Sequence, residues 1–164
     1  ASAAGLVLLL QDIPCDGKTR AAVLEAHFRP QPRVREAQWL AAGGAVTAAM
    51  DMSDGLLKDI REIMEANGCG ALLFEEKIPV HPAARAVAAA AGRSPLDFAL
   101  HGGEDYELLF TVPEATFNDL ATAYREHFGQ PLYQLGLLTE ENRLRMVTKT
   151  GKWVELVFAG YRHF

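Results

Sequence analysis

The sequence contains no apolar run long enough to cross a membrane. The apolar stretch nearest its start, from Gly5 to Leu10, is the size of a strand, whereas a membrane span needs roughly 18 residues. No basic segment precedes this stretch, which argues against a signal peptide. We therefore expect a cytoplasmic protein that does not act at a membrane.

Cysteine and clustered positive charge are also scarce. Cys15 and Cys69 are too few for a disulfide framework or a zinc site, so we expect two free thiols. The net charge of -5, without a dense Lys/Arg cluster, argues against nucleic acid as a partner. The common phosphate-loop, dinucleotide and nucleophile-elbow motifs are missing from the sequence, and its histidines lack metal-ligand spacing.

The composition is that of one soluble globular domain. Of the 164 residues, 49% are hydrophobic and 23% are charged, which is enough to form a single core. We expect one domain over residues 1–164, and the abrupt apolar opening suggests that the chain was cut from a longer protein.

Hydrophobic periodicity and Gly/Pro punctuation predict alternating helices and strands. The predicted helices span residues 16–28, 33–42, 54–67, 82–91, 94–100 and 113–128, and the predicted strands span 5–10, 46–52, 70–74, 106–112, 132–138, 144–148 and 153–158. We expect the strand at 46–52 to be buried, that at 106–112 to be central, and the last three to form a meander. These elements predict an α+β fold, with a mixed β-sheet packed against helices.

Two acidic segments stand at predicted junctions between elements. In AMDMSDGL, an apolar strand leads to Asp51, Ser53 and Asp54 just before a helix. These residues either cap the helix, or they hold a hard cation such as Mg²⁺ while the helix N-terminus attracts phosphate. In HGGEDYELLF, two glycines are followed by Glu104 and Asp105 just before a strand. This segment forms either a tight acidic turn or a ligand site that the glycines allow the backbone to approach closely.

The chain ends in FAGYRHF, which is unusually aromatic for a terminus. This tail either docks on the core of the domain or supplies an aromatic ring that stacks on a planar ligand.

Five segments taken in order resemble the thiamine-monophosphate kinases of the AIR synthase superfamily. They are SAAGL, RPQPR, DMSDGL, GGEDYELLFTVP and GYRHF, so the resemblance runs along the whole chain. Met52 stands where that family usually has Ile or Leu. The resemblance implies a C-terminal domain of the AIR synthase type. It also implies a separate N-terminal domain, outside this chain, that supplies most metal ligands and the dimer interface of a homodimer.

The resemblance also implies an activity and a role for each site residue. The activity is Mg²⁺- and ATP-dependent phosphorylation of thiamine monophosphate to thiamine diphosphate, which the isolated chain would not perform alone. The family pattern assigns no catalytic side chain here, and the implied site residues are Asp51 and Asp54 as Mg²⁺ ligands, Ser53 as an ATP contact, and Gly102, Gly103, Glu104 and Tyr161 as substrate contacts.

Two other readings remain open. In the first, the chain belongs to another ATP-dependent enzyme of the superfamily, such as AIR synthase, selenophosphate synthetase or the hydrogenase-maturation dehydratase. In the second, it is a non-catalytic module of the same fold that binds a nucleotide or a partner.

Overall fold

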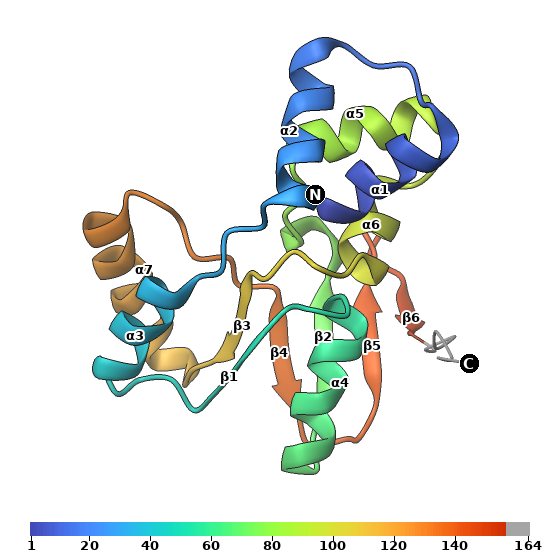
Figure 1. Ribbon diagram of the computed structural model, residues 1–164. Coiled ribbons are helices and arrows are strands. Elements are labelled where there is room, and N and C mark those ends of the chain that lie inside the picture. The colour runs from blue at the N-terminus through green and yellow to red at the C-terminus, as the bar shows by residue number, and fades with distance from the viewer. Residues whose placement is uncertain (157–164) are drawn as a thin grey trace.

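The computed structural model describes residues 1–156 and shows a mixed α/β arrangement (Figure 1). The elements are α1 (Ser2–Gln11), α2 (Gly17–Phe28), α3 (Val34–Ala42), β1 (Ala48–Asp51), α4 (Leu56–Asn67), β2 (Gly70–Phe74), the short 3-10 helix η1 (Glu75–Lys77), α5 (Pro82–Ala90), α6 (Pro95–His101), β3 (Leu108–Thr111), α7 (Glu114–Phe128), β4 (Gly136–Thr139), β5 (Leu144–Val147) and β6 (Trp153–Glu155). Within this part of the chain, none of the helices has both the length and the apolar character that a bilayer crossing demands.

The strands form two separate sheets. β1 and β3 pair antiparallel as a two-stranded sheet, and the other four strands are ordered β4-β2-β5-β6. In the larger sheet β2 is antiparallel to β4 and parallel to β5, while β5 and β6 form an antiparallel pair. The expectation of a meander was wrong, because β2 lies between β4 and β5. The expectation that β3 is a central strand was also wrong, because β3 pairs with β1 alone among the described strands. β1 is also half-exposed rather than buried.

Helix α4 covers one face of the four-stranded sheet (Figure 1). Its apolar residues recur at helical spacing, as the sequence predicts, and they meet buried residues of β2 and β5. The helix ends where Gly68 takes a left-handed conformation with φ 62°, which a glycine adopts without steric cost. The members of this core are Leu56, Leu57, Ile60, Ile63, Met64, Ala71, Leu73, Ile78, Leu100, Leu109, Leu144 and Met146.

Helices α1, α2 and α5 pack together with Phe98 of α6 around a second core (Figure 1). The predicted strand from Gly5 to Leu10 is wrong, because these residues belong to α1. A short apolar run cannot by itself distinguish a strand from a helix. Here Ala4 and Leu8, one helical turn apart, are buried against α2 and α5.

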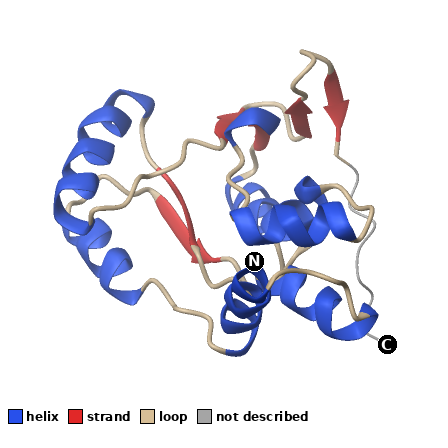
Figure 2. Ribbon diagram, turned by 90° about the horizontal axis from the view of Figure 1, so that it is seen from above, coloured by secondary structure: helices blue, strands red, loops and turns tan. Residues whose placement is uncertain are grey.

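Helices α3 and α7 form the third packed unit. Trp39 of α3 meets the Tyr124 ring edge-on at 5.9 Å between centroids and stacks on His127 at 5.5 Å. Viewed from above, this pair stands apart from the other helices, and the β1–β3 sheet runs between the two groups (Figure 2). The small sheet therefore joins the α3–α7 unit to the rest of the domain.

Candidate functional site

The first acidic segment connects β1 to α4. β1 ends at Asp51, and the loop of residues 52–55 leads into the first turn of α4. The side chains of Asp51 and Asp54 are exposed, while Ser53 is half-buried. The carboxylates therefore face solvent, where a ligand can reach them.

The second acidic segment, residues 102–107, lies directly against this loop. The N–H of Glu104 donates to the carbonyl of Ser53 at 2.8 Å, and the N–H of Tyr106 donates to the carbonyl of Met52 at 3.0 Å. In return, the N–H of Met52 donates to the carbonyl of Glu107 at 2.7 Å. Backbone hydrogen bonds thus continue the β1–β3 ladder past the ends of the strands and bring together two motifs about 50 residues apart in the sequence.

Two glycines allow this close approach. A Cβ at Gly103 would stand 2.5 Å from the carbonyl oxygen of Ser53, and Gly55 adopts φ 106°, which L-residues with side chains rarely adopt. Gly102 likewise packs against the backbone of Phe98 and the side chain of Ala3. The space that side chains would occupy at Gly102 and Gly103 is therefore filled by neighbouring segments of the protein.

Two residues of the second loop hold a left-handed backbone although they are not glycine. Glu104 has φ 61° and Tyr106 has φ 50°. Such conformations cost of order 1–3 kcal/mol each, and they persist where the surroundings impose them. The hydrogen bonds from both N–H groups to the first loop impose them here, and they fix the direction in which the Glu104 side chain leaves the backbone.

Asp54 is engaged in an ion pair on its own helix. Its Oδ2 accepts from Lys58 Nζ at 2.6 Å, and this hydrogen bond raises the pKa of Lys58. The side chains are 44% and 39% exposed, so solvent screens the pair and a competing cation can displace the lysine.

Asp59 lies beneath the loop and is fully buried. Its carboxylate accepts the N–H of Gly55 at 3.1 Å and, more weakly, the N–H of Asp54 at 3.4 Å. Burial raises the pKa of Asp59 to about 6, although these N–H groups oppose the shift. The carboxylate thus binds the N–H groups of the two residues that precede α4.

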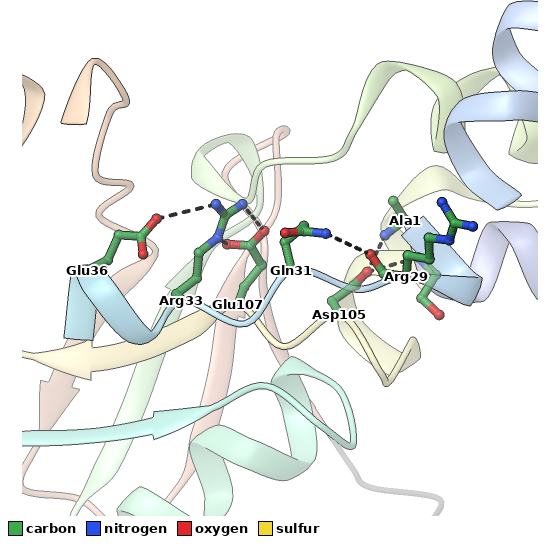
Figure 3. Close-up of polar contacts among 8 residues, drawn as sticks. Ala1, Arg29, Gln31, Arg33, Glu36, Asp105 and Glu107 are labelled. Carbon is green, nitrogen blue, oxygen red and sulfur yellow. Dashed lines mark hydrogen bonds and ion pairs between the residues drawn. The ribbon is translucent and has the colours of Figure 1, made fainter. Parts of the chain in front are cut away.

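The second loop is also anchored on the side facing the α2–α3 connection, as Figure 3 shows. Arg33 makes two hydrogen bonds to Glu107, from Nε to Oε2 at 2.9 Å and from Nη2 to Oε1 at 2.8 Å, and these contacts raise the pKa of Arg33. Asp105 accepts the N–H of Ser2 at 2.9 Å. The acidic residues on either side of Tyr106 therefore hold separate parts of the chain in place.

The donor set fits Mg²⁺ in kind but not in number. Carboxylate oxygens are the ligands that Mg²⁺ prefers, and Asp51 and Asp54 supply them. Among residues 1–156, however, no group of three or more His, Cys, Asp or Glu residues converges closely enough to hold a metal ion. A cation at this loop would need further ligands from water, from a nucleotide or from another domain.

Of the five predicted site residues other than glycine, four lie close together in the structure. Asp51, Ser53, Asp54 and Glu104 lie on the two joined loops, whereas Tyr161 lies outside the described residues. Sequence reasoning missed Asp59 even though a signal was present, because an acidic residue interrupts the apolar face of α4. The partners of Glu107 and Asp105 had no such local signal, since they are 74 and 103 residues away.

An apolar groove of about 420 Å³ lies away from these loops. The unpaired edges of β3 and β4 line it, together with residues of α4 such as Ile60 and Ile63. It contains none of the predicted site residues, so we assign the candidate site to the two acidic loops on geometry and chemistry.

The fold and both loops match a known family. Residues 5–149 match the family model described as AIR synthase related protein, C-terminal domain. The chain belongs to this family. The predicted resemblance and fold class are thereby confirmed.

Members of this family share sequence and structure with the chain over nearly all of its length. It is 36% identical to the thiamine-monophosphate kinase of Escherichia coli O157:H7, over 99% of this chain and 49% of the kinase. The chain thus spans about half the length of the curated relatives it matches. A solved structure described as "AaThiL complexed with AMPPCP and TMP" has a TM-score of 0.79 at 28% identity, covering 99% of this chain and 48% of that one.

A second solved structure shares the fold alone. Escherichia coli HypE has a TM-score of 0.77 at 21% identity, over 98% of this chain and 47% of that one. At this identity the likeness concerns the architecture and carries no inference about the reaction.

Proposed function

We propose that the chain is the C-terminal part of a thiamine-monophosphate kinase, which transfers the γ-phosphoryl group of ATP to thiamine monophosphate and forms thiamine diphosphate. The observation that carries this proposal is the joining of the two acidic loops by backbone hydrogen bonds between residues 52–53 and 104–107. Its second support is the identity of 36% to a curated kinase with that activity.

The proposed roles divide between the two loops. Asp51 and Asp54 hold Mg²⁺, and Ser53, between them in the same loop, contacts ATP. Glu104 on the facing loop contacts the substrate, where a carboxylate suits the positive thiazolium ring of thiamine. Gly102 and Gly103 allow the substrate-side loop to lie close to the ATP-side loop, and Tyr161 stacks on the substrate rings.

The chemistry asks little of a catalytic side chain. The acceptor is a phosphate oxygen, which is largely deprotonated near neutral pH because its second pKa is about 6, so a general base is not needed. The main requirement is to hold two anions in line and to offset their negative charge. Mg²⁺, when bound, supplies positive charge for this purpose. Asp51 and Asp54 hold that charge beside the ATP-contacting Ser53.

The site needs a second domain. The described residues bring together too few ligands for a metal ion, and the relatives are about twice as long as this chain. We therefore propose that an N-terminal domain of the same cytoplasmic protein completes the metal site and forms a homodimer. Accordingly, the isolated 164-residue chain should show no turnover.

The test is a turnover assay on the full-length protein. It should convert ATP and thiamine monophosphate to thiamine diphosphate in a Mg²⁺-dependent reaction, and Asp54→Asn should sharply lower the rate or raise the Mg²⁺ requirement. α4 has no side-chain N-cap, and Asp54 forms an exposed ion pair with Lys58, so the fold should survive this change. Asp119→Asn, on the exposed face of α7, is the matched control and should have no effect.

Two outcomes would contradict the proposal. One is a folded full-length protein that makes no thiamine diphosphate under these conditions. The other is an Asp54→Asn variant that loses stability yet keeps its rate per folded molecule, which would leave Asp54 with a structural role alone, through its ion pair with Lys58.

A further inference from the structure

Asp59 is a buried acid for which the proposed reaction has no direct use. Its side chain has no exposed surface, and its neighbours Leu56 and Ile60 are buried apolar residues of the same helix. An ionised carboxylate is costly to bury unless its oxygens accept hydrogen bonds, so its presence on this face requires a local cause.

The hydrogen bonds of Asp59 point to that cause. Both carboxylate oxygens accept backbone N–H groups of the loop between β1 and α4, one from Asp54 and one from Gly55. The charged neighbours that influence Asp59 most are two further acids, Asp54 and Glu62, and both oppose its ionisation. The contact therefore brings negative charge together beneath a loop that already exposes carboxylates.

The same loop is held from its other side. The N–H of Glu104 binds the carbonyl of Ser53 at 2.8 Å, and Gly55 packs against the backbone of His101 and Gly102. Asp59 holds the loop from below, while the segment 101–104 holds it from the facing side. Between them lies the residue whose side chain we assign to the cation, Asp54.

We infer that Asp59 is a positioning residue for cation binding: it fixes the backbone of Asp54 and Gly55, the two residues that precede α4. The inference rests on the proposed function, since it takes Asp54 as a Mg²⁺ ligand. The Asp59 carboxylate also adds negative charge beneath the loop, and this charge favours a cation at Asp54.

The test compares two variants of α4 in the full-length protein. Asp59→Asn keeps the size of the side chain but turns one acceptor into a donor, which faces an N–H group. The half-saturating Mg²⁺ concentration for ATP-dependent turnover should rise about 10-fold or more, as when outer partners of metal ligands are removed. The KM for thiamine monophosphate should stay unchanged. Glu62→Gln removes an equal charge from an exposed site one turn away and should change neither quantity.

A second measurement does not depend on activity. In metal-free protein, the amide hydrogens of Asp54 and Gly55 should exchange with solvent more rapidly in Asp59→Asn than in the wild type, whereas amides in the middle of α4 should not change. If Asp59→Asn does not fold, the same two amides are measured in the wild type. Exchange as fast as that of an unprotected amide overturns the inference, and slower exchange supports it.

The remaining outcomes separate the two proposals. An unchanged Mg²⁺ requirement in a folded Asp59→Asn variant overturns the positioning role, even when the free energy of unfolding falls. A wild-type protein that forms no thiamine diphosphate refutes the proposed kinase function instead, and the exchange measurement still decides whether Asp59 holds the loop.

Discussion

Removing the ion pair between Arg33 and Glu107 should loosen the loop that carries Glu104. The guanidinium forms two parallel hydrogen bonds with the Glu107 carboxylate, at 2.9 and 2.8 Å, and also approaches Glu36 at 3.5 Å (Figure 3). Hydrogen bonds between charged groups are stronger than neutral ones, and a pair of them adds energy and fixes the geometry. These two bonds tie residue 107 to the segment before α3.

The structure sets the expected size of the effect. The Arg33 side chain is 27% exposed and that of Glu107 is 52% exposed, so solvent screens the pair and its value lies within the range of surface pairs. The favourable geometry places it near the top of that range, at about 1 kcal/mol. Arg33→Lys should lose most of this energy, because a lysine ammonium lacks the rigid, planar pair of N–H donors that matches both carboxylate oxygens.

The assay is a double-mutant cycle on unfolding by urea. Arg33→Gln, Glu107→Gln and the double variant should give a coupling free energy of about 1 kcal/mol at low salt, which falls at 0.5 M NaCl. The control is the Arg29–Glu25 pair, which is 3.9 Å apart with side chains 76% and 63% exposed and should couple near zero. Equal coupling in the two cycles would refute the reasoning from geometry and exposure.

Three further predictions concern the same site. Lys58→Gln frees Asp54 from its ion pair and should lower the half-saturating Mg²⁺ concentration of the full-length enzyme by about two-fold, as a Mg²⁺ titration of turnover would show; a rise would mean that Lys58 assists binding. Asp59 has a pKa of about 6 in the folded chain, against an ordinary value of 3.8, so its carboxyl group holds a proton more tightly when the chain is folded. The protonated group therefore stabilises the fold below pH 3.8, and this stabilisation is lost as the pH rises through 6. In metal-free urea unfolding, the free energy of unfolding of wild type relative to Asp59→Asn should thus fall by about 1 kcal/mol from pH 5 to 7.5, and an unchanged difference would contradict this. Tyr161→Ala in the full-length protein should weaken the binding of thiamine monophosphate but not that of ATP, whereas Tyr161→Phe should have a mild effect, because stacking needs the ring. Calorimetric titration with each ligand measures both affinities. A Tyr161→Ala variant that binds thiamine monophosphate normally would show that the ring does not contact the substrate.

Elements with strong local signals were predictable from the sequence. The β2 strand, Gly70–Phe74, has the predicted bounds, and α2 follows Asp16, whose side chain accepts the N–H of Thr19 as an N-cap. The helix from Glu114 to Phe128 ends at Gly129 in a left-handed conformation, again as predicted. Each of these boundaries depends on neighbours a few residues away, which the sequence displays directly.

Features that depend on distant residues were not predictable in this way. The start of α1 is held by Asp105, which accepts the N–H of Ser2 from 103 residues away. This contact is not visible in the local sequence, and the apolar residues that follow Ser2 predict a strand where the structure has a helix. The insertion of β2 between β4 and β5 likewise depends on pairing between segments more than 60 residues apart. The same holds for the candidate site. Both acidic motifs could be identified from the sequence, whereas the contact between them and the role of Asp59 could not.

The left-handed backbone at Glu104 limits how this site can be redesigned. The hydrogen bonds that join the two loops involve main-chain atoms, so exchanging the side chain at this position would leave them intact. At φ 61°, however, only glycine adopts the conformation freely, asparagine and aspartate tolerate it, and β-branched residues are strongly disfavoured. A library designed to change what this loop binds should therefore favour Asn, Asp and Gly at position 104 and place bulkier replacements at other positions.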